Sequence, residues 1–251
     1  MKAILFLPQL LLFTTGFLAA QNDDVGPLQS LKAPVKLELA KKIVGEGEKR
    51  KSGVRITNTS GKNMKSFVVS VYYLDAGGEE QKSVPFTRSG FSGVNSVILA
   101  RGKQHVMEVD SFFMEDDTAS IDAILTEIEY SDGTSWPEVP ETPAVRKDDE
   151  PVAAKMVGVL GKGVTRQPVI ACYNFEDKEV VLVNFQIKYF DANGEELKST
   201  GYGYFGDGAI KENGSACFAG GDPPPAGTVG VKVSLNQVRF ADETEWKPSK
   251  D

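Results

Sequence analysis

The chain contains one pattern twice. Asp75 and Asp191, which are 116 residues apart, each end a run of alternating apolar residues, and each is followed by the same spacing of glycine and two glutamates. A second pair of matching blocks ends in Trp136 and Trp246, which are 110 residues apart. Similarity at a fixed spacing indicates a duplicated structural unit. The chain is therefore predicted to fold as two related units, each of about 100 residues, which is a usual domain size.

Both copies have the sequence pattern of β-strands. Short runs alternate between apolar and polar residues, and helical periodicity is not found after the N-terminal segment. The longest alternating run, 67–73, ends at the turn sequence Asp-Ala-Gly-Gly (75–78), and the second copy has Asp-Ala-Asn-Gly (191–194) there. Many short strands separated by turns predict an all-β fold, and the unit size favours two tandem immunoglobulin-like β-sandwich domains.

Composition divides the chain into five predicted segments. Residues 1–20 carry one cation and then an apolar stretch, as in a secretory signal peptide. Residues 21–34 are polar and aperiodic, as in a flexible leader, and 137–151 hold four prolines and a charged run, as in a semi-extended linker. The two sandwich repeats are 35–136 and 152–248. This layout predicts a secreted or periplasmic protein with no membrane span once the signal is removed.

Charge excludes one class of partner. The chain has 28 Lys and Arg against 35 Asp and Glu, a formal net charge of −7. Binding a nucleic acid backbone needs a cationic surface, so a nucleic acid partner is not expected.

Both cysteines, Cys172 and Cys217, lie in the second copy. An oxidising compartment permits a disulfide between them, and we predict that they lie within bridging distance. Two buried free thiols remain the alternative, because sequence spacing does not determine side-chain geometry.

No catalytic or metal-binding residues emerge, and no cofactor is expected. The single histidine, His105, aligns with Cys217 of the other copy and has no nucleophile motif beside it. Zinc sites need three or four ligands at characteristic spacings. Glutamate pairs such as Glu79-Glu80 and Glu195-Glu196 follow turns, and neighbouring strand residues point to opposite faces, so solvated charge is favoured over catalysis.

Two aromatic features remain as candidate binding sites. Trp136 and Trp246 recur at one position of each copy, which favours packing in the core over an exposed ligand platform. The glycine-rich run 201–208 carries Tyr202, Tyr204 and Phe205. We predict these three rings to be partly exposed and to contact a partner; an edge strand with bulges is the alternative.

The residues around the two turns resemble a known family. Val71, Tyr73, Leu74, Asp75 and Gly78, and their counterparts in the second copy, are similar to the FxLYD-type, immunoglobulin-like modules of exported bacterial proteins. The resemblance implies a sandwich fold without shared catalytic residues. The predicted function is therefore a non-enzymatic module that engages a protein or cell-envelope partner. The alternatives are a carbohydrate-binding module and a carboxylate-dependent carbohydrate-active enzyme.

Overall fold

The computed structural model describes residues 25–45, 49–89, 97–141, 144–147 and 149–249. The predicted signal peptide, 1–20, lies outside this range. The described residues form β-strands and short 3₁₀ turns, which include η2 (Ser111–Phe113) and η3 (Gly163–Thr165), without an α-helix. Among them there is also no helix of the length and apolar character needed to cross a membrane. The prediction of an all-β fold is confirmed.

The strands form four antiparallel sheets. In chain order, the strands are β1 (Val25–Pro27), β2 (Val35–Val44), β3 (Lys51–Asn58), β4 (Met64–Leu74), β5 (Glu80–Ser89), β6 (Gln104–Asp110), β7 (Ser120–Tyr130), β8 (Ser135–Trp136), β9 (Val152–Leu160), β10 (Gln167–Asn174), β11 (Val180–Phe190), β12 (Glu196–Ile210), β13 (Ser215–Ala219), β14 (Gly230–Phe240) and β15 (Glu245–Trp246).

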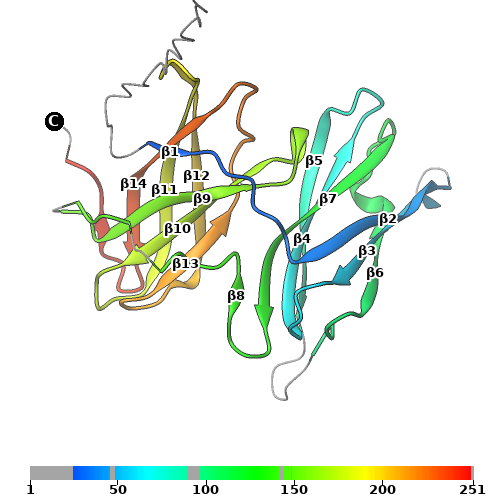
Figure 1. Ribbon diagram of the computed structural model, residues 1–251, viewed down its shortest axis with the longest axis horizontal. Coiled ribbons are helices and arrows are strands. Elements are labelled where there is room, and N and C mark those ends of the chain that lie inside the picture. Colours follow the sequence, from blue (N-terminus) through cyan, green and yellow to red (C-terminus); the bar gives the residue numbers. More distant parts are fainter. Residues whose placement is uncertain (1–24, 46–48, 90–96, 142–143, 148, 250–251) are drawn as a thin grey trace, which may run out of the picture.

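The two halves of the chain repeat one strand arrangement (Figure 1). In the first half, β2-β3-β6 forms one sheet and β5-β4-β7-β8 the other; in the second half, β9-β10-β13 and β12-β11-β14-β15 follow the same order. Register shifts recur at matching positions, such as Val68/Val69 and Asn184/Phe185. Each half has its own hydrophobic cluster, to which both of its sheets contribute. The sequence repeat therefore corresponds to a repeated structure.

The repeated turn residues have matching local roles. The carboxylate Oδ1 of Asp75 accepts hydrogen bonds from backbone N–H groups two and four residues further on, at 2.8 and 2.9 Å, and that of Asp191 does the same at 2.8 and 2.9 Å. Tyr73 and Tyr189, which precede these turns, are fully buried in the two cores. The duplicated Tyr-x-Asp spacing thus encodes a core side chain followed by a capped hairpin turn.

A buried asparagine closes the loops of each half. Asn58 and Asn174 are 0% and 3% exposed. The Asn174 Nδ2 donates to the carbonyl oxygens of Lys178 and Lys211 at 2.7 and 3.0 Å, while its Oδ1 accepts from the Glu176 N–H at 3.1 Å. The Asn58 Nδ2 makes the same type of paired donation, to two backbone carbonyls at 2.8 and 3.0 Å. Each asparagine therefore satisfies backbone groups that its half would otherwise bury without partners.

The N-terminal segment lies against the second half, not the first. β1 pairs with β14, and the chain then crosses to β2 of the first half (Figure 1). On the way, the Leu31 N–H donates to the Val159 carbonyl at 2.8 Å, the Val159 N–H donates to the Gln29 carbonyl at 2.7 Å, and Leu28 packs on the second core. We call residues 25–31 the strap. This part of the predicted flexible leader is a paired strand because backbone pairing needs no alternating side-chain pattern.

The predicted linker is also held by contacts. The Tyr173 hydroxyl donates to the Pro140 carbonyl at 2.9 Å, Arg146 pairs with Glu176 at 3.0 Å, and Pro137 is buried. A third apolar cluster joins the halves directly, and its buried members are Tyr72, Ile124, Leu160 and Val169. The halves are therefore connected by the strap, the linker and a shared apolar contact.

Candidate functional site

The glycine-rich run 201–208 belongs to an edge strand. β12 lies at the end of its sheet and pairs only with β11 among the described strands. The pairing continues to Leu182 opposite Phe205 and resumes at Val180 opposite Ile210, so residues 206–209 bulge away from the sheet. Glycine at 206 and 208 suits such a bulge, because it lowers the steric cost of irregular backbone.

Tyr202 and Tyr204 are packing residues. Both are half-buried against the second core. The ring of Tyr202 lies 6.3 Å from that of Phe185, and the ring of Tyr204 lies 4.1 Å from that of Phe218, both in stacked geometry. Burial raises the pKa of Tyr202 to about 12, and its hydroxyl donates to the Ala219 carbonyl at 3.2 Å. Only part of each ring is left for a partner.

Phe205 is different, because its side chain is 77% exposed. It borders an open groove of about 630 Å³ at the end of the second half. The groove is lined by residues of β11, β12, β14 and the turn and strand that follow β14: Val181, Phe205, Gly206, Arg239, Phe240, Ala241, Glu243 and Glu245. We call this the Phe205 groove.

The rim of the Phe205 groove carries both signs of charge. Arg239 pairs across the β14–β15 ladder with Glu245, whose carboxylate is 3.0 Å from the Lys247 ammonium. The hydrogen bond from Lys247 holds the pKa of Glu245 below its usual range. A general acid needs a raised pKa, so the environment of Glu245 favours binding over proton donation.

Phe205 and Tyr202 should respond differently to truncation. Phe205→Ser removes an exposed ring, so we expect the melting temperature to change little, whereas Tyr202→Ser should cost about 2–3 kcal/mol because it removes a packed ring. Thermal and denaturant unfolding of both variants check this. Equal destabilisation by the two changes would contradict the assignment of Phe205 as a surface residue.

The duplicated tryptophans pack against the cores. Trp136 pairs with Ile128 across β7–β8, and Trp246 pairs with Val238 across β14–β15. Both side chains are half-buried and lie against apolar clusters. They occupy matching positions, as expected, and this packing supports their interpretation as core residues.

Among the described residues of the first half, Phe112 in η2 is a strongly exposed aromatic residue, at 84%. Its ring meets that of Phe113 edge-to-face at 5.0 Å. Sequence patterns do not single out Phe112, because the segment has no alternating pattern and no counterpart in the second copy.

The remaining candidates do not come together. His105 is half-buried on β6 and pairs with Ile56, whose counterpart in the second half is Cys172. Cys217 pairs instead with Ala171, one residue before Cys172. The positions of His105 and Cys217, which align in the sequence, therefore differ by one residue in the structure. In the described part of the chain, no three His, Cys, Asp or Glu side chains gather as a metal site would require.

The predicted disulfide is wrong. Cys172 and Cys217 are free thiols on neighbouring strands, with Cys217 opposite Ala171 and Cys172 opposite Ala216. This one-residue offset turns their side chains to opposite faces of the sheet. Cys172 packs in the second core, whereas Cys217 packs in the cluster between the halves.

Both thiols should be unreactive in the folded protein. Burial raises the pKa of the Cys217 thiol to about 12 and that of Cys172 well above its usual value, so neither forms much thiolate at pH 8. We expect iodoacetamide to alkylate both cysteines in denaturant without reductant and neither in the native state, as measured by intact mass. If the denatured protein gained the mass of two alkyl groups only after treatment with reductant, a disulfide between the two cysteines would be indicated instead.

The comparisons with known proteins identify no family. No family model and no curated protein matches the chain. Of the solved structures, red sea bream transglutaminase is 12% identical with a TM-score of 0.25, and the match covers 88% of this chain and 32% of that one. The C-terminal globular domain of oligosaccharyltransferase from Pyrococcus abyssi is 10% identical with a TM-score of 0.22, covering 91% and 54%. The chain thus spans about a third and about half of these two structures, and the low scores carry no functional argument.

Proposed function

We propose that this protein is an exported, non-enzymatic binding module of two immunoglobulin-like sandwiches, and that it engages a protein partner through the Phe205 groove. The observation that carries the proposal is the 77% exposure of Phe205 beside the apolar groove residues Val181 and Phe240. An exposed aromatic anchor surrounded by charged residues is typical of protein interfaces.

The rest of the second half supports this use of Phe205. Its neighbours Tyr202 and Tyr204 are fixed by stacking, so the strand presents Phe205 on a supported edge. Rigid presentation reduces the conformational entropy that binding would otherwise cost. The groove rim, with Arg239 and Glu245, offers both a cation and an anion for pairing with a polar partner surface.

Site-specific photo-crosslinking tests the proposal. A photoreactive residue is placed at Phe205 and, as a control, at Val145, which is 88% exposed but lies outside the groove. In the cells that produce the protein, we expect a discrete protein adduct from position 205 and none from 145. An absence of adducts at 205, or identical adducts at both positions, would contradict it. Retention on insoluble polysaccharide that Phe205→Ser abolishes would favour the carbohydrate-binding alternative.

A further inference from the structure

The two halves differ in what fills one groove. In the second half, the strap lies at the groove between β9 and β14: β1 pairs with β14, and Gln29 and Leu31 bond with β9. Leu28 belongs to the same apolar cluster as the groove residues Ala154, Met156 and Val233. The strap therefore adds backbone pairing to both β14 and β9, and it adds the apolar side chain of Leu28 to the second core.

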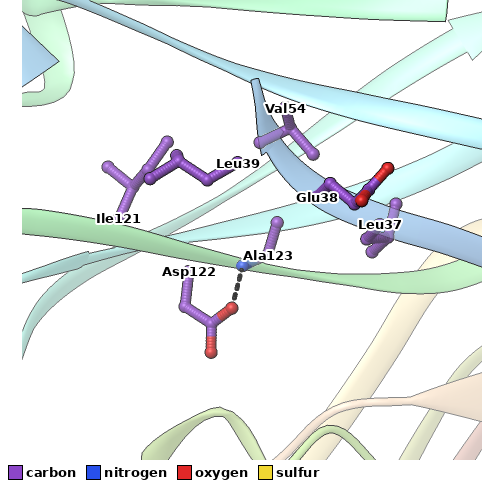
Figure 2. A pocket seen from close by; sticks show the side chains of 7 residues that line it. All are labelled: Leu37, Glu38, Leu39, Val54, Ile121, Asp122 and Ala123. Carbon is purple, nitrogen blue, oxygen red and sulfur yellow. Dashed lines mark hydrogen bonds between the residues drawn. The ribbon is translucent and has the colours of Figure 1, made fainter. Parts of the chain in front are cut away.

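The matching groove of the first half lies between β2 and β7, and it is open. Strand register pairs Leu37 and Leu39 of β2 with Ile56 and Val54, as it pairs Ala154 and Met156 of β9 with Cys172 and Ile170. A cavity of about 60 Å³ lies there, more than the 10–15 Å³ or so that one water needs. Figure 2 shows its lining residues: Leu37, Glu38, Leu39, Val54, Ile121, Asp122 and Ala123.

Two features show that no described segment fills this groove. Leu39 is 50% exposed, whereas its counterpart Met156 packs on the core beside the strap. In the described residues, β8 pairs with β7 only at Ile128 and Glu129. The part of the β7 edge that begins at Ser120 therefore has no neighbouring strand among them, whereas the matching part of β14 pairs with β1. At this edge, the carboxylate of Asp122 accepts a hydrogen bond from the Ala123 N–H at 2.8 Å (Figure 2).

The charges beside the two grooves are opposite. Glu38 and Asp122 of the first half stand where the second half has Lys155 and Lys232. The carboxylate of Glu38, on β2, lies 2.7 Å from the ammonium of Lys36, which offsets its charge. Asp122, at the edge of β7, is therefore the acidic group that we expect a bound segment to meet. In the second half, Lys232 lies opposite Val25 of the strap, three residues before Leu28. A segment that suits the first groove would carry basic residues there instead.

The first groove also differs where the strap approaches most closely. A Cβ atom at Gly158 would lie 2.6 Å from the Leu31 Cγ and 2.7 Å from the Gln29 carbonyl oxygen. The first half has Lys41 at this register position. The close approach of the strap requires glycine at this position, which the first half lacks, so an exchanged strap is disfavoured as the occupant.

We propose that the groove between β2 and β7 binds an extended segment of a partner protein, in which a basic stretch precedes one aliphatic residue. The segment adds a strand to the free edge of β7, as β1 does to β14, and its aliphatic side chain enters the cavity beside Leu39. Backbone pairing supplies affinity, and the cavity and Asp122 supply selectivity. This site is separate from the Phe205 groove and does not depend on it.

Peptide binding to the full chain tests the proposal. The probe is a fluorescent peptide of residues 21–28 with Asp23→Lys and Asp24→Lys, which keeps Leu28 and omits the part that needs Gly158; the unmodified peptide is the comparison. By anisotropy, we expect the lysine peptide to bind at least about tenfold more tightly, a difference of about 1.4 kcal/mol. Hydrogen exchange should slow at residues 120–123 of β7. Equal binding of the two peptides would overturn the charge argument.

Variants localise the binding. Leu39→Glu should weaken the lysine peptide about tenfold or more, while Leu197→Glu, a matched change of a leucine that is 41% exposed on β12, should leave it unchanged. Asp122→Lys should reverse the preference in favour of the unmodified peptide, and circular dichroism verifies that each variant is folded. Failure of the lysine peptide to bind, or equal binding by all variants, would overturn the proposal. So would a dimer in solution that occupies β7 with a second strap.

Discussion

Asn174→Asp should lower the stability of the second half by about 3 kcal/mol, because it removes two hydrogen bonds and buries a charge. The Asn174 amide donates to the carbonyl oxygens of Lys178 and Lys211, and a carboxylate oxygen in its place would face both without a hydrogen. Denaturant unfolding at pH 7 measures the loss.

The pH dependence gives this prediction a second readout. Burial beside two carbonyls should raise the pKa of the introduced carboxyl in the folded state above its value in the unfolded chain. A raised folded pKa means that stability is regained as the pH falls from 7 toward 4, where the carboxyl is protonated. Asn236→Asp, on an exposed position of β14, is the matched control and should stay within about 0.5 kcal/mol of the parent. A loss of equal size in the control would contradict the role of Asn174.

Gly158→Val should release the strap from β9. The added side chain would begin 2.6 Å from the Leu31 Cγ, closer than non-bonded atoms can lie, so residues 29–31 must move away. Overpacking of this kind costs about 1–3 kcal/mol. We expect faster amide hydrogen exchange at Leu31 and Val159, whose backbone bonds are broken, and earlier proteolytic cleavage within the strap.

The matched control for this change is Gly206→Val on β12. A Cβ atom there would meet no atom within 4 Å, so exchange at Leu31 and Val159 should be unaffected. Unchanged protection of Leu31 in the Gly158→Val variant would show that the strap does not depend on this close approach.

The repeat was predictable because fold-determining residues were copied with their spacing. Tyr73, Asp75 and Trp136 recur at matching structural positions, since a core side chain, a turn cap and a strand-end ring each demand one residue type. Asn58 and Asn174 carry the same 116-residue spacing, so the buried asparagines could have been found from the sequence. The residue type alone does not mark them as buried, because asparagine is common at exposed turns.

Other features depend on register and on distant partners, which local patterns do not encode. The offset of one residue between Cys172 and Cys217 decides that their side chains face apart. The strap pairs with β14, which is more than 200 residues away in the sequence. Phe205 and Phe240 line the same groove because their strands, β12 and β14, are the two neighbours of β11 in the sheet. Sequence identified the ring at 205 but not the groove around it.

The pairing of β1 with β14 has a consequence for synthesis. β1 emerges from the ribosome before every strand of the first half, yet its partner is made after β13. The first half can complete its own sheets from contiguous strands, whereas the second half is complete only when both ends of the chain have met. Contacts of such sequence separation form late, because the entropy of closing the loop comes first. The nascent chain therefore carries an unpaired β-strand, a natural client for a chaperone, until translation is nearly finished.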